Sequence, residues 1–177
     1  GFVDPHDGRG ACLQKIIQAV GNPSQRFRED ALRILRALRF AAVLGFQIDP
    51  GTQIGMRELT ENIHLLSRER VAAEFDKLLT GDGAADILRQ FPDIVRTAIP
   101  PLAALMEASP QPTPWERGLL ILQNTPAELT LRWAALLLGL GADTARDTLR
   151  QLRQPTRLII EVRTLIASMT LPVQEPL

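Results

Sequence analysis

The sequence predicts an all-α fold built from a succession of mostly short helices. From about Ser24 onward, apolar residues recur at intervals of three and four, which is the spacing of amphipathic helices. No run of alternating apolar and polar β-branched residues marks a strand in this part of the chain. With 177 residues, the chain is long enough to bury a substantial core.

Capping residues, glycines and prolines set the predicted helix limits. Gly45 is placed to end the first strong helix, Ser67 to begin a later one and Gly81 to end that one. Residues 13–20 fit either a helix or a strand. The predicted helices cover 24–44, a segment starting near 52, the segment between 67 and 81, then 84–91, 94–106, 115–122, 129–138, 144–152 and 156–169.

The amino-acid composition limits the classes of function that this protein can have. Twenty basic and twenty acidic residues cancel, so overall charge favours neither a nucleic-acid nor a membrane partner. The only two lysines are Lys15 and Lys77, so eighteen of the basic residues are arginines, whose planar guanidinium groups suit phosphates and base edges. The single cysteine, Cys12, excludes an internal disulfide framework. The longest uncharged stretch near the C-terminus, 133–142, is too short to span a membrane. We therefore expect a cytoplasmic protein.

The segment 26–40 concentrates positive charge, with five arginines and two acidic residues. On one continuous helix, Asp30, Arg33, Arg36 and Arg39 would follow each other at three-residue intervals and form a ridge on one side. One interpretation is a solvated face on which Arg33 pairs with Glu29 or Asp30. The other is a binding site.

Three sequence elements carry a resemblance to a known family. The run from Gly21-Asn22-Pro23 through Glu29-Asp30-x-x-Arg33 to Leu44-Gly45-Phe46 resembles the neck of class II tRNA nucleotidyltransferases, which are the CCA-adding enzymes and bacterial poly(A) polymerases. Upstream, Asp4-Pro5-His6-Asp7-Gly8 is similar to the element that ends their catalytic head. Downstream, the Leu65–Arg70 run and the run from Glu74 to Leu79 resemble the family's next conserved element.

The resemblance implies a role for each residue. Asp30 and Arg33 would act as a protein template for the incoming base, because a carboxylate only accepts hydrogen bonds and a guanidinium only donates them. Glu29 would orient Arg33. The remaining implied roles are triphosphate or tRNA backbone contacts for Arg36 and Arg39, bracing of the neck for Glu69 and Arg70, and a hinge between head and neck at Asp4 and Gly8.

The resemblance also implies an organisation and an activity. Residues 1–22 would end an α/β head, 23–108 would form the neck, 109–114 a linker rich in proline, and 115–177 part of the body. The family adds CMP or AMP to tRNA 3′ ends from CTP and ATP, with Mg²⁺ held by carboxylates of the head. This sequence has neither a Gly-Gly-x-x-Arg-Asp nor an Asp-x-Asp element. We therefore expect no nucleotide transfer by this chain alone.

Other interpretations remain open at this point. His6-Asp7 could belong to a metal site, although a turn is the simpler interpretation, and Leu138-Gly139 stand where metal-binding relatives would carry histidine and aspartate. The arginines within 143–163 fit either tRNA backbone contacts or a solvent face of mixed charge. Trp115 and Trp133 are predicted to be core residues.

A different class of function is a free-standing helical interaction or RNA-binding scaffold without nucleotide chemistry. Such a scaffold would need an exposed apolar patch and no open pocket near Asp30.

Overall fold

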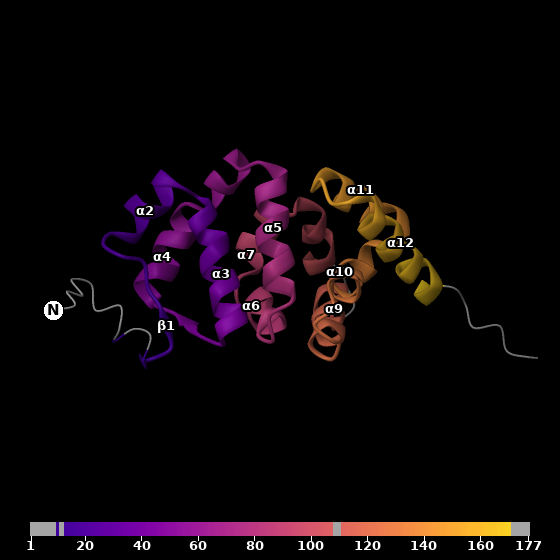
Figure 1. Cartoon of the computed structure of the whole chain (residues 1–177), viewed down its shortest axis with the longest axis horizontal. Helices are drawn as coiled ribbons and strands as arrows, with labels where there is room; N and C mark the ends of the chain where they lie inside the picture. The colour runs from indigo at the N-terminus through magenta and orange to yellow at the C-terminus, as the bar shows by residue number, and fades with distance from the viewer. Residues whose placement is uncertain (1–9, 11–12, 108–110, 171–177) are drawn as a thin grey trace, which may run out of the picture.

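The computed structural model of the chain describes Gly10 and residues 13–107 and 111–170, which form an elongated stack of helices (Figure 1). The helices are α2 (Pro23–Glu29), α3 (Leu32–Leu44), α4 (Pro50–Glu58), α5 (Arg68–Leu79), α6 (Ala84–Gln90), α7 (Pro92–Ala98), α8 (Ala103–Glu107), α9 (Pro114–Gln123), α10 (Leu129–Leu137), α11 (Ala142–Gln151) and α12 (Thr156–Thr170), with short 3-10 helices η1 (Thr60–Leu65), η2 (Pro100–Leu102) and η3 (Leu138–Leu140). The prediction of an all-α fold is confirmed.

The only sheet within the described residues is a pair of two-residue strands. β1 (Ile16–Ile17) runs parallel to β2 (Gln47–Ile48), and backbone hydrogen bonds from Gln47 and Asp49 to the β1 side fix the register. This pair attaches the start of the described chain to the end of α3. Within residues 13–20, which fit either a helix or a strand by sequence, only Ile16–Ile17 form a strand.

Side-chain caps set several helix starts, and the one at Ser67 was predicted from the sequence. Asn22 accepts a hydrogen bond from the Gln25 amide at 3.0 Å, and Ser67 caps α5 in the same way. At the other end of α3, Gly45 has a φ of 66°, a left-handed conformation that glycine adopts without strain. α4 begins at Pro50, two residues earlier than predicted, because Asp49 caps it and proline suits the first helical position.

The predicted continuous helix over 24–44 is wrong, because the chain breaks at Asp30. The Asp30 backbone is extended, with φ −153° and ψ 103°, and its carboxylate accepts the amide hydrogen of Leu32 at 3.0 Å. A short acidic side chain that bonds to a nearby backbone amide competes with the helical hydrogen bonds. The segment therefore forms two helices, α2 and α3, with Asp30 between them.

The predicted helix over 94–106 is also interrupted. Phe91 alone separates the end of α6 from α7, which starts at Pro92, and Pro100 and Pro101 open η2. Proline has no amide hydrogen with which to continue a preceding helix. The later helices follow their predicted ranges to within two residues, except that η3 continues α10.

One continuous core runs through the stack, from Phe27 in α2 to Ile166 in α12. Trp133 is fully buried and packs against Phe75 of α5 with ring centroids 6.3 Å apart, and Trp115 is buried as well. The prediction that both tryptophans are core residues is confirmed. Residues on both sides of the proline-rich segment thus share a core, while the domain boundary at 109–114 stays a prediction.

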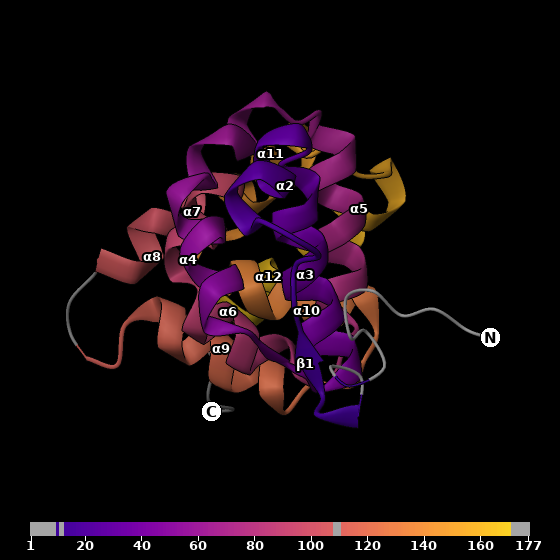
Figure 2. The same cartoon turned by 90° about the vertical axis from the view of Figure 1, so that its left-hand side faces the viewer.

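The arrangement places two groups of helices at opposite ends of the molecule. α2, α3 and α4 lie at one end, α5, α6 and α7 in the middle, and α11 and α12 at the other end (Figure 1). Viewed along this axis, α2 and α3 lie in front of α10 and α12 (Figure 2). None of the helices in the described ranges combines the length and apolar character that crossing a membrane requires.

Candidate nucleotide-binding site

A pocket of about 220 Å³ opens between β1, the α2–α3 pair and the start of α4. Three of its lining residues are arginines, and none of the described residues that line it is acidic. The lining residues are Ile17, Gln18, Ala19, Val20, Arg26, Phe27, Arg33, Arg36, Ala37, Phe40 and Thr52. An apolar floor with a few cationic donors at its edge suits a flat base that carries phosphates.

Arg33 is held in place at this pocket by two neighbours on α2. Its Nη1 donates to Glu29 Oε2 at 2.8 Å and to the Arg26 carbonyl oxygen at 2.9 Å. The same Glu29 oxygen also accepts from Arg26 at 3.1 Å. The hydrogen bond from Arg33, with Arg26 close by, holds the pKa of Glu29 below its ordinary value of 4.5. Glu29 therefore pairs with Arg33, as the sequence predicts for one of the two adjacent acids.

The side chain of Asp30 forms hydrogen bonds with different residues from those that hold Arg33. Its carboxylate accepts from Arg70 on α5, at 3.2 Å to Oδ2 and 3.4 Å to Oδ1, in addition to the Leu32 amide. The Asp30 side chain does not line the pocket, although 29% of it remains exposed. The expectation that Asp30 begins a helical ridge with Arg33 is wrong, because Asp30 lies in the break before α3.

Arg36 and Arg39 share one carboxylate on α5. Arg36 Nε lies 3.4 Å from Glu74 Oε1, and Arg39 Nε lies 3.3 Å from Glu74 Oε2. Arg36 also lines the pocket, whereas Arg39 turns toward α5 and places its guanidinium 4.1 Å from the centre of the Phe40 ring. Each step of three residues along a helix falls about 60° short of a full turn. Arg33 and Arg39, which are six residues apart on α3, therefore face directions about 120° apart.

Glu74 is the residue at this site that sequence reasoning missed. Its side chain is only 7% exposed, and α5 buries it beside its core residues Val71 and Phe75. An acidic residue placed among the buried positions of a helix is a signal that could have identified it, because a buried carboxylate needs cationic partners.

The two residues predicted to brace the neck behave differently. Arg70 links α5 to Asp30, whereas Glu69 is exposed in the first turn of α5 and forms no ion pair with a described residue. Asp4 and Gly8, the predicted hinge, lie outside the described residues, as do His6-Asp7 and Cys12.

The described residues bring together no group of three or more histidine, cysteine, aspartate or glutamate side chains that could hold a metal ion. His64 is half exposed and faces Glu61 at 3.4 Å. Leu138 and Gly139 lie in η3.

Comparisons with known proteins show which family the chain resembles. Residues 45–92 match the family described as the probable RNA- and SrmB-binding site of polymerase A. The CCA-adding enzyme of Limosilactobacillus fermentum is 40% identical over 144 residues, a match that covers 80% of this chain and 34% of that protein. The chain thus spans about one third of the length of that relative.

Solved structures show the same helical arrangement. The CCA-adding enzyme of Bacillus stearothermophilus in complex with CTP superposes with a TM-score of 0.75 at 30% identity, covering 94% of this chain and 41% of that one. A tRNA nucleotidyltransferase complexed with a primer tRNA and an incoming ATP analogue shares the fold, with a TM-score of 0.65 at 19% identity over 95% of this chain and 51% of that one. The chain therefore belongs to the class II CCA-adding enzyme and poly(A) polymerase family, of which it represents part of the helical region.

Proposed function

We propose that this chain forms the neck and part of the body of a nucleotidyltransferase that adds CMP, AMP or both to tRNA 3′ ends without a nucleic-acid template. The observation that carries the proposal is the fixed position of Arg33, which Glu29 and the Arg26 carbonyl hold at the edge of a pocket with three arginines. A scaffold without nucleotide chemistry gives no reason for such a pocket beside Arg33.

The residue types explain how a protein can select the incoming base. Cytosine and adenine each present an exocyclic amino group beside a ring acceptor, which match the acceptor Asp30 and the donor Arg33. Uracil and guanine present a carbonyl oxygen toward the carboxylate, so the pair repels them. A good hydrogen-bonded pair contributes about 1–3 kcal/mol of discrimination between bases.

Because the chain breaks between α2 and α3, Arg33 and Asp30 are held by different helices. Arg33 is held from α2, and Asp30 is held by Arg70 from α5. Each side chain still has unused capacity, because a guanidinium has five N–H donors and a carboxylate accepts about four hydrogen bonds. We propose that the base lies across the break between α2 and α3 and forms hydrogen bonds with both Asp30 and Arg33.

The reaction's other components belong to the same proposal. CTP and ATP are the nucleotide substrates, and tRNA is the acceptor. Mg²⁺ would be held by carboxylates of a catalytic head and would neutralise the charge of the triphosphate there. A cytoplasmic location fits such an activity.

The proposal is tested by nucleotide incorporation into tRNA by the enzyme that carries this chain together with a catalytic head. Arg33→Ala should lower kcat/KM for CTP and ATP by about tenfold or more, because the base loses its donor. Arg28→Ala is the matched control, since Arg28 lies exposed on α2, forms no ion pair with a described residue and does not line the pocket. Equal losses for the two variants would contradict the proposal.

A further inference from the structure

One row of residues on α4 contacts both parts of the chain between which the candidate nucleotide pocket opens. Thr52, Gly55 and Glu58 follow each other at three-residue intervals on this helix, so they lie along one side of it. Their contacts are with the segment 19–24, which continues from the β1 wall of the pocket into the start of α2. The position of this segment therefore depends on α4.

Thr52 attaches the β1 wall of the pocket to the start of α4. Its buried hydroxyl oxygen accepts the amide hydrogen of Ala19, a residue that lines the pocket, at 3.0 Å. The same hydroxyl donates to Oδ2 of Asp49, the N-cap residue of α4, at 3.1 Å. With both a donor and an acceptor as partners, the hydroxyl of Thr52 has a fixed orientation.

Gly55 lets α2 approach α4 more closely than a residue with a side chain would. A Cβ at this position would lie 2.8 Å from the Cβ of Pro23 and 3.1 Å from the amide nitrogen of Ser24, whereas ordinary contacts begin near 3.4 Å. One turn further along α4, the Ser24 hydroxyl donates to Glu58 Oε2 at 2.7 Å. Glycine weakens the interior of a helix, so the close contact with α2, rather than helix formation, explains its presence in α4.

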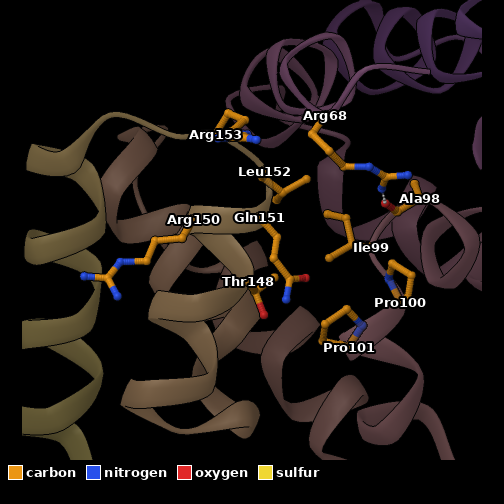
Figure 3. A pocket seen from close by; sticks show the side chains of 10 residues that line it. All are labelled: Arg68, Ala98, Ile99, Pro100, Pro101, Thr148, Arg150, Gln151, Leu152 and Arg153. Atoms are coloured by element: carbon orange, nitrogen blue, oxygen red, sulfur yellow. Dashed lines mark hydrogen bonds between the residues drawn. The ribbon is translucent and has the colours of Figure 1, made fainter.

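α4 is itself attached to the middle of the stack. Arg57 pairs with Asp93 of α7 at 3.5 Å, and its guanidinium lies 5.5 Å from the centre of the Phe91 ring. The other end of α7 is held from α5, where Arg68 donates to the Ala98 carbonyl oxygen at 3.1 Å (Figure 3). A substitution that separates α2 from α4 should therefore move α2, which lies at the end of the stack (Figure 1).

The position of α2 determines where the guanidinium of Arg33 lies. Arg33 Nη1 donates to two oxygens of α2, the Arg26 carbonyl oxygen at 2.9 Å and Glu29 Oε2 at 2.8 Å. Pro23, which Gly55 contacts, lies less than one helical turn before Arg26. A displacement of α2 by about 0.5 Å is enough to lengthen these hydrogen bonds beyond their usual range of about 2.7–3.2 Å.

We propose that Gly55 is a positioning residue for nucleotide selection, because the close contact of α2 with α4 at Gly55 sets where Arg33 meets the base. The hydrogen bond between Ser24 and Glu58 holds α2 in that position. Gly55 does not line the pocket and acts only through α2. A small displacement of a group that orients a substrate can lower the rate strongly. The inference rests on the proposed function, since it takes Arg33 as a contact of the base.

The test is the ratio of kcat/KM for CTP to that for UTP, measured for the enzyme that carries this chain with a catalytic head. Gly55→Ala adds one methyl group between α4 and α2 and should lower the ratio about three- to tenfold. Ser24→Ala removes only the hydrogen bond to Glu58 and should lower the ratio about two- to threefold. Because Ser24 is partly exposed, Ser24→Ala keeps the fold and decides the question if Gly55→Ala does not fold.

Gly118→Ala is the matched control for crowding at a buried helical glycine. A Cβ on Gly118 would lie 3.1 Å from the Ala135 carbonyl oxygen, and none of the described residues that line the pocket lies on α9. Gly118→Ala should lower the thermal denaturation midpoint of the enzyme and leave the CTP-to-UTP ratio unchanged. A wild-type ratio in Gly55→Ala, or an equal loss in Gly118→Ala, would overturn the role of Gly55.

Arg33→Ala, measured in the same assay, separates this inference from the proposed function. If Arg33→Ala lowers kcat/KM while Gly55→Ala keeps the wild-type ratio, the role of Gly55 is overturned and the proposed function stands. If Arg33→Ala is as active as the wild type, the proposed function is contradicted, and the role of Gly55 falls with it.

Discussion

The indole N–H of Trp133 donates to Asp76 Oδ1 at 2.8 Å, which joins α10 to α5 at the centre of the stack. Gln154, before α12, donates to the same oxygen at 2.7 Å. One half-buried carboxylate thus connects α5 to α10 and to the residue before α12. Burial raises the pKa of Asp76 above its ordinary 3.8, and the two hydrogen bonds oppose that shift.

Removing this carboxylate should destabilise the whole fold. Asp76→Ala leaves the buried Trp133 N–H and the Gln154 amide without their acceptor, so we expect the free energy of unfolding to fall by about 2–4 kcal/mol. Urea denaturation measures it. Asp82 is exposed and lies two residues after Thr80, the C-cap residue of α5. Asp82→Ala should therefore change the free energy of unfolding by less than about 0.5 kcal/mol. Equal effects of the two substitutions would show that the contact contributes nothing.

The raised pKa of Asp76 predicts a specific pH dependence. Between the unfolded value near 3.8 and the higher folded value, the native state binds more protons than the unfolded state. The stabilisation linked to the protonation of Asp76 is therefore full below that window and is lost as the pH rises through it, while the hydrogen bonds from Trp133 and Gln154 remain. Asp76→Asn keeps an oxygen for Trp133 and Gln154 but does not titrate.

Denaturation of wild type and Asp76→Asn across this pH range tests the sign. The free energy of unfolding of the wild type, relative to that of the variant, should decrease as the pH rises. Glu29 and Glu161, whose pKa values are lowered by hydrogen bonds from Arg33 and Arg157, favour the opposite trend in both proteins and cancel in the difference. A difference that grows with pH would mean that Asp76 is stabilised as an anion.

Glu74 holds two arginines of α3 from α5, and its removal should be costly. Glu74→Ala leaves Arg39, only 15% exposed, without a counter-charge, so we expect the free energy of unfolding to fall by about 2–3 kcal/mol. Glu69→Ala on the same helix loses only an exposed charge near the helix start and should cost less than about 1 kcal/mol. Thermal or urea denaturation distinguishes them; a Glu69 effect as large as that of Glu74 would refute the bridging role.

The purified 177-residue chain should not transfer nucleotides by itself. The sequence lacks the paired-carboxylate elements of the family, and the described residues form no cluster fit for a metal ion. The measurement is incorporation of labelled CMP or AMP into tRNA lacking its 3′ end. Robust incorporation would show that the chain contains a catalytic centre of its own.

The parts of this fold that depend on neighbouring residues were predictable from the sequence. Ser67 and Gly45 act within one helical turn of the chain they cap, and the tryptophans follow the apolar pattern. The break at Asp30 was not predictable from helical periodicity, because it depends on a carboxylate bond to the backbone and on Arg70, forty residues along the chain.

Dependence on residues distant in the sequence also explains which site contacts the sequence did not predict. The arginines at 33, 36 and 39 share a spacing, but their directions depend on which carboxylate lies opposite, and Glu74 reaches them only through the packing of α5 on α3. Contacts between segments that are distant in the sequence produce no regular residue spacing from which they could be predicted.

We propose that Asp30 accepts a hydrogen bond from the exocyclic amino group of the incoming base. The most direct test of this contact is the ratio of kcat/KM for CTP to that for UTP, measured for the enzyme that carries this chain with a catalytic head. Asp30→Asn presents an amide that can donate to the uracil carbonyl, so the ratio should fall by about tenfold or more. Arg70→Met, which removes only the support from α5, should change the ratio less. An Asp30→Asn enzyme with the wild-type ratio would contradict the account.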